Sequence, residues 1–122
     1  MSYDVEFHKN VESTKTGFED YEKAEELGLF INSDLNITFN LNKMFSWALD
    51  CEYWIDEVEG FKGSDVAPKL AKAISKMLLN KSEAEKYNSP NGWGTYPNAL
   101  RFLTLFCQEC VENGDFWVAI DR

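Results

Sequence analysis

Three short segments of alternating apolar and polar residues constrain the fold of this chain more than any other feature. They cover residues 3–8, 35–41 and 116–121, near the start, the middle and the end of the sequence. A period of two is typical of a strand with one buried face, so we expect three strands. The connection between the second and third strands is long enough for a crossover, which allows a mixed sheet.

The long connection carries apolar residues at three- and four-residue steps, the spacing of one face of a helix. We expect one helix over 44–58, with Asn42 as its N-cap. A second helix is expected over 65–78. A third is expected to begin after Thr95, the predicted N-cap, and to end at Gly114.

Two shorter helical segments are also expected. Residues 18–27 are rich in acids and are followed by Gly28, a residue suited to a helix C-terminus. Residues 82–87 begin with the spacing of a capping box. Strands spread along a chain with helices between them favour an α+β fold, in which two or three helices pack on one face of a small three-stranded sheet. With 122 residues, of which 44% are hydrophobic, residues 1–122 are expected to form a single domain.

Charge is distributed unevenly between the two halves of the chain. Residues 1–60 carry fourteen acids and four lysines, whereas residues 61–122 carry seven acids and eight bases. The acidic half would repel nucleic acid and membrane surfaces and could attract a basic partner. The start of the chain lacks a basic segment followed by an apolar run, and the apolar stretches are shorter than a membrane span needs. We therefore expect a soluble cytoplasmic protein.

The three cysteines and the single histidine do not form a pattern typical of a cofactor or metal site. Cys107 and Cys110 match C-x-x-C, but they lie in the second half of an expected helix, where the helix dipole opposes a thiolate. A zinc site needs about four ligands, and Cys51 and His8 have no matching spacing. We interpret the cysteines as core residues and expect no catalytic residue, no cofactor and no metal.

Five carboxylates crowd a short stretch of the expected helix over 44–58: Asp50, Glu52, Asp56, Glu57 and Glu59. A helix that buries its tryptophans would turn these acids to solvent. They form either a solvated acidic face or a face that binds a partner. Paired catalytic carboxylates would have to face each other across a cleft, which sequence spacing does not indicate.

The segment Pro90–Tyr96 is the most unusual stretch of the chain. Asn91 and Gly92 form a strong turn signal, and glycine permits a positive φ or a close backbone approach. Trp93 lies between two glycines. We favour the interpretation that Trp93 folds back into the core as a plug. The alternative is a recognition loop in which Asn91 and Trp93 contact a partner.

Two segments together resemble a group of small uncharacterised proteins of bacteria and their phages. These segments are residues 36–45, with the sequence NITFNLNKMF, and residues 90–96, with the sequence PNGWGTY. The resemblance covers about residues 35–120. It implies a bacterial or mobile-element origin and supplies no catalytic residues.

The sequence favours a non-enzymatic acidic interaction protein, associated with a phage or prophage, that binds a protein partner. A counter-defence inhibitor that mimics nucleic acid is the sharpest form of this hypothesis, and an immunity-type toxin neutraliser is a related one. A second hypothesis is a small enzyme or small-ligand binder with an aromatic pocket drawn from Trp47, Trp54, Trp93 or Tyr96. A homo-oligomeric regulatory or structural subunit is a third.

Overall fold

A three-stranded antiparallel sheet forms one layer of the computed structural model, which describes residues 2–122. The strands are β1 (Ser2–His8), β2 (Phe30–Thr38) and β3 (Trp117–Asp121), arranged in the order β2–β1–β3. Both neighbours of β1 run antiparallel to it, so the sheet is not mixed. The α+β class predicted from the alternating segments is confirmed.

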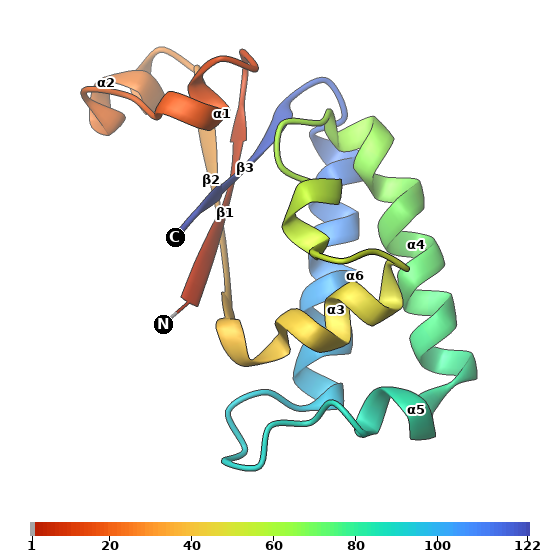
Figure 1. Cartoon of the computed structure of the whole chain (residues 1–122). Coiled ribbons are helices and arrows are strands. Elements are labelled where there is room, and N and C mark those ends of the chain that lie inside the picture. Colours follow the sequence, from red (N-terminus) through yellow and green to blue (C-terminus); the bar gives the residue numbers. More distant parts are fainter. Residues whose placement is uncertain (1) are drawn as a thin grey trace.

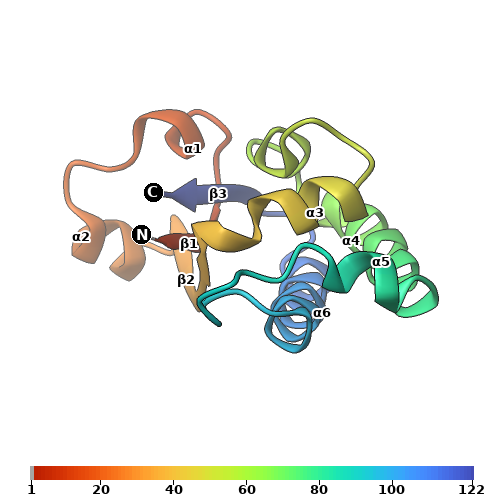
Figure 2. The same cartoon turned by 60° about the horizontal axis from the view of Figure 1, so that its bottom comes forward.

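Helices make up the rest of the regular structure, and they lie on two sides of the strands (Figures 1 and 2). The α-helices are α1 (Ser13–Thr16), α2 (Tyr21–Glu26), α3 (Asn42–Ala48), α4 (Gly63–Leu79), α5 (Lys81–Glu85) and α6 (Tyr96–Glu112). Two short 3-10 helices are η1 (Phe39–Leu41) and η2 (Trp54–Glu57). In Figure 1 the helices α3, α4 and α6 lie to the right of the strands, and the short helices α1 and α2 lie at the upper left.

The main core lies between the sheet and the helices α3, α4 and α6. Val5 and Phe7 of β1 are fully buried on this inner face, as the period of two predicts. The indole of Trp54, also fully buried, packs against Phe45 at 5.1 Å and Phe102 at 6.3 Å between ring centroids. Trp54 also meets Tyr3 of β1 edge-on at 5.9 Å between ring centroids, so the aromatic side chains join the sheet to the helical layer.

The outer face of the sheet carries a second, smaller buried cluster. His8 is 1% exposed and its ring lies tilted against Phe18 at 4.8 Å between centroids, while Tyr21 meets Phe30 edge-on at 5.3 Å. Ala24 of α2 is buried there as well. The segment that contains α1 and α2 thus covers part of the outer face, a cover that the sequence did not predict.

The prediction of one helix over 44–58 is wrong, because the chain turns sharply in the middle of this segment. Helix α3 ends at Ala48, and Asp50 adopts a φ of 55°, which a right-handed helix does not allow. The chain resumes as η2, where Trp54 N donates to Ser46 Oγ at 3.1 Å. Both pieces bury their apolar side chains in the same core, so the apolar spacing continues across the break.

Asn42 is not the N-cap of α3, which is Leu41. Its half-buried side chain instead lies at the edge of the core, where Oδ1 accepts from Trp54 Nε1 at 2.9 Å and Nδ2 donates to the Tyr3 hydroxyl at 2.9 Å. Asn42 therefore satisfies the one polar group of the buried indole.

The middle strand is displaced from its predicted position. It begins at Phe30 rather than at 35, and it ends at Thr38, where the side chain accepts from Asn40 N and starts η1. Because Glu6 pairs with Asn32 and Asp4 pairs with Asn36, three residues of β2 oppose a single residue of β1. This bulge explains why alternation fails as a guide to the first half of β2.

Gly63 sets how closely α4 approaches α6. A Cβ atom at this position would lie 2.7 Å from the Cys110 carbonyl oxygen and 2.8 Å from that of Asn113. Both contacts are with backbone, which cannot rotate away. We expect Gly63→Ala to lower the free energy of unfolding, measured by urea denaturation, by about 1–3 kcal/mol.

Gly114 provides the matched control for this substitution, since a Cβ there would lie no closer than 3.5 Å to its neighbours at the same junction. We expect a clearly smaller effect for Gly114→Ala. Equal stabilities of the two variants would show that the close approach at Gly63 is not a packing constraint.

Candidate functional site

A groove lined by acidic side chains lies between α2 and the outer face of the sheet. Its volume is about 680 Å³, and we call it the acidic groove. Its lining residues come from β1, α2, β2 and β3, and they are Glu6, Tyr21, Glu22, Glu25, Glu26, Phe30, Asn32 and Asp121. Every charged residue in this lining is a carboxylate.

Four of the groove carboxylates are exposed and have no ion-pair partner within residues 2–122: Glu22, Glu25, Glu26 and Asp121. Glu22, Glu25 and Glu26 stand at positions i, i+3 and i+4, so they share one face of α2. Their like charges repel one another, and a cation between them would relieve that repulsion.

The phenol of Tyr21 lies at the rim of the acidic groove, in the negative potential of these carboxylates. Partial burial raises the pKa of the Tyr21 hydroxyl, and the charges of Glu6 and Asp121 raise it further. An aromatic ring that remains 40% exposed beside several carboxylates offers a cationic side chain both a face and counter-charges.

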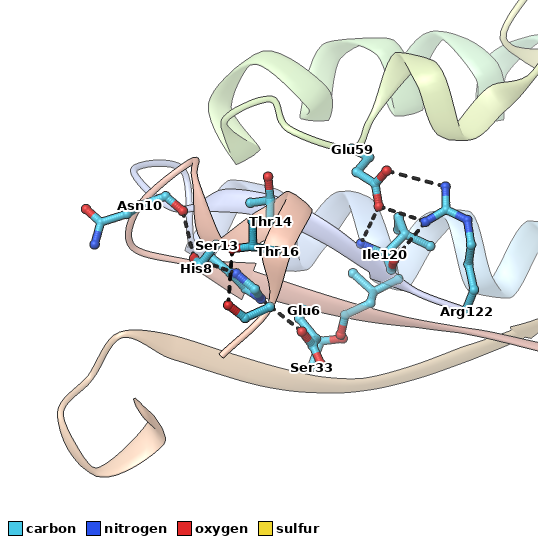
Figure 3. A network of polar contacts seen from close by, with 12 residues as sticks. Glu6, His8, Asn10, Ser13, Thr14, Thr16, Ser33, Glu59, Ile120 and Arg122 are labelled. Atoms are coloured by element: carbon cyan, nitrogen blue, oxygen red, sulfur yellow. Dashed lines mark hydrogen bonds and ion pairs between the residues drawn. The ribbon is translucent and has the colours of Figure 1, made fainter. Parts of the chain in front are cut away.

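A smaller polar pocket of about 400 Å³ adjoins the acidic groove and shares Glu6, Tyr21 and Asp121 with it. Figure 3 shows the polar network that underlies this pocket. His8 Nδ1 lies 2.8 Å from Ser13 Oγ, and His8 Nε2 lies 2.9 Å from Glu6 Oε1. The Ser13 hydroxyl also lies within donating distance, 3.0 Å, of the Asn10 carbonyl oxygen.

The sequence of contacts Ser13–His8–Glu6 is that of a nucleophile, a base and an orienting acid. Catalysis also needs donors for a developing oxyanion and access for substrate to the base. The first amides of α1 are already used within the turn, with Thr14 N donating to the Val11 carbonyl oxygen, and His8 is 1% exposed. The arrangement therefore fits a buried clamp that holds α1 on the sheet.

Glu59 closes the other side of the polar pocket. Its Oε2 accepts from Ile120 N at 3.2 Å and from Arg122 Nη1 at 3.1 Å (Figure 3). The hydrogen bond to Glu59 is the main cause that raises the pKa of the Arg122 guanidinium, and the charge of Glu59 raises it further. Glu59 thus contacts the edge of β3 that faces away from β1.

The five carboxylates predicted as a face do not form one unpaired acidic surface. Asp50 is paired with Lys76, Glu57 lies 3.8 Å from Lys69, and Glu59 is bound to Arg122. The hydrogen bond from Lys76 lowers the pKa of the Asp50 carboxyl. The two without an ion pair in the described part of the chain, Glu52 and Asp56, are exposed.

The prediction that Trp93 plugs the core is wrong, since its side chain is 72% exposed. The backbone of Gly94 packs inward instead, where a Cβ would lie 3.1 Å from Leu41 Cγ. Asn91 shapes the loop, because its Oδ1 accepts from Trp93 N at 2.9 Å. Thr95 is the N-cap residue of α6 as predicted, but the capping acceptor is Asn88 Oδ1, which lies 2.8 Å from Tyr96 N.

The aromatic residues considered for a ligand pocket are separated in the structure. Trp54 and Tyr96 are buried in the core, while Trp93 and Trp47 line two different pockets. Burial raises the pKa of the thiols of Cys107 and Cys110, which disfavours a reactive thiolate at either. Over residues 2–122, no group of three or more histidine, cysteine or acidic side chains is placed to hold a metal ion.

Comparison with protein-family models, curated proteins and solved structures found no match to this chain. Among the helices of the described residues, none combines the length and the apolar character needed to cross a membrane.

Proposed function

We propose that this chain is a non-enzymatic binding protein whose acidic groove receives a basic segment of a protein partner. One observation carries the proposal: all charged side chains lining the groove of about 680 Å³ are carboxylates, four of them without an ion pair in residues 2–122. Lysine or arginine side chains would supply the missing counter-charges, and Tyr21 would contact them through its ring.

The overall charge of the chain supports the same function. A net charge of −9 attracts a basic partner over a distance and speeds its encounter, and the groove then fixes where the partner binds. A phage-encoded inhibitor that mimics nucleic acid, or an immunity-type toxin neutraliser, would be a particular form of this function. In the first form, a DNA oligonucleotide would compete for the partner's basic surface.

Neutralising the α2 acids tests the groove directly. We expect the triple variant Glu22→Gln, Glu25→Gln, Glu26→Gln to bind a synthetic arginine-rich peptide at least about tenfold more weakly, a loss of about 1.4 kcal/mol. The reason is that each substitution removes a charge that faces the peptide. Isothermal titration calorimetry at low salt measures the change, and added salt should weaken binding of the wild type.

The control is a second triple variant with the same change in net charge but with substitutions outside the groove: Glu85→Gln, Glu112→Gln and Asp115→Asn. It should retain most of the affinity. If the control loses as much affinity as the α2 variant, the peptide responds to net charge alone and the groove is not its binding site.

A further inference from the structure

We propose that the free edge of β2, the Trp93 loop and α6 form a second docking groove. Its occupant is an extended segment of a partner protein that carries an apolar side chain and a carboxylate. The groove has a volume of about 370 Å³, and its lining includes residues 34–38, Trp93, Arg101 and Leu105. It is distinct from the acidic groove in both position and charge.

One edge of the sheet is covered and the other is open. The outer edge of β3 is covered, since Gly60 N donates to the Val118 carbonyl oxygen and Val118 N donates to that of Phe61, both at 2.8 Å. Glu59 accepts from Ile120 N on the same edge. On the outer side of β2, by contrast, no strand of residues 2–122 is paired. An open edge presents backbone donors and acceptors that an extended segment can pair with.

The free run of this edge is short. Asp34, with a φ of 60°, lies in the bulge, where the Leu35 amide donates to Ser33 Oγ at 3.2 Å. This local bond occupies the Leu35 amide, so the available edge covers 36–38. A segment of only a few residues can therefore pair, and side-chain contacts must supply the rest of the affinity.

The loop holds Trp93 in a position where it can contact a side chain of the bound segment. Two hydrogen bonds fix the loop around it: Ser89 N donates to the Gly94 carbonyl oxygen at 2.7 Å, and Trp93 N donates to Asn91 Oδ1. The indole is 72% exposed, and Leu105 of α6 is 37% exposed in the same groove. A preorganised exposed tryptophan beside an apolar wall is typical of an interface anchor.

Arg101 favours a carboxylate on the occupant, because the one acid in the groove lining, Asp34, lies at the bulge end. It is exposed on α6, and its guanidinium makes no ion pair in the part of the chain that the structure describes. A carboxylate on the bound segment would form a bidentate pair with it. A second copy of this chain offers a poorer match, because the only charged residue of its β2 is Asp34, in the bulge.

A short synthetic peptide with an aromatic residue flanked by valines and glutamates is the probe for this groove. Binding should shift the amide resonances of residues 36–38 and the indole N–H resonance of Trp93 in a two-dimensional NMR titration. We expect Trp93→Ala and Arg101→Glu each to weaken binding at least about tenfold. Matched peptides with lysine for glutamate, or with proline for valine, should bind correspondingly less.

Leu79→Ala is the control variant, since Leu79 is 83% exposed at the end of α4 and outside the groove. Its affinity for the peptide should equal that of the wild type. The proposal is overturned if the peptide does not bind at about 1 mM, or if Trp93→Ala binds it as well as the wild type. Self-association that shifts the same amides and is abolished by Trp93→Ala would assign the groove to a second copy and overturn the partner assignment.

Discussion

Replacing Trp54 with alanine is expected to lower the free energy of unfolding by about 3–5 kcal/mol. The indole is fully buried and packs against Phe45, Phe102 and Tyr3. Its removal leaves a large cavity between the sheet and the helices and deprives Asn42 Oδ1 of its donor. Against a total stability of about 5–15 kcal/mol for a typical domain, this loss is severe.

Trp93→Ala is the matched variant for Trp54→Ala, since it deletes the same side chain at an exposed position. We expect a change of no more than about 0.5 kcal/mol. Chemical denaturation of the two variants, followed by circular dichroism, measures the contrast. A loss at Trp93 comparable to that at Trp54 would mean that the loop tryptophan is part of the core, contrary to its 72% exposure.

The sequence was sufficient to predict those elements whose periodicity is determined by one buried face. The strands at both ends of the chain and the long helices α4 and α6 follow their apolar patterns closely. Each of these elements lies with one face on the main core. For such elements, the burial of a stripe or of alternate side chains leaves a direct trace in the sequence.

The break in the predicted helix over 44–58 shows where this reasoning fails. An apolar spacing records which side chains are buried, and it does not record the φ angle of Asp50 between them. The prediction for Trp93 was wrong for a related reason. Glycines on both sides of a tryptophan indicate a close approach to the core. The same pattern is produced when the Trp93 side chain packs inward and when the Gly94 backbone does.

The acidic groove was missed because its residues are distant in the sequence. The acids of α2 were visible as a segment with little apolar face, but Glu6 and Asp121 join them only when β1 and β3 pair. Conversely, three of the five carboxylates that cluster over residues 50–59 are paired with lysines or an arginine far along the chain. Counting charges along a sequence does not reveal which of them lack a partner.

His8→Ala is expected to lower the free energy of unfolding by about 3 kcal/mol or more. The substitution removes a ring packed against Phe18 and Phe30, and it leaves the Glu6 carboxylate, which is 9% exposed, without its donor on the ring. Ser13 loses its contact with the ring as well. Thermal and urea unfolding measure the total loss of stability. Hydrogen exchange should show that α1 opens before the strands of the sheet do.

Glu6→Gln separates the hydrogen bond from the charge. The amide oxygen can still accept from His8 Nε2, so we expect a loss of about 1 kcal/mol or less. His8→Ala should also weaken binding of the arginine-rich peptide, although every exposed acid of the groove is retained, because α2 reaches the outer face through the segment that His8 clamps. If His8→Ala is no more destabilising than Glu6→Gln and binds the peptide normally, the buried network does not hold the wall of the groove.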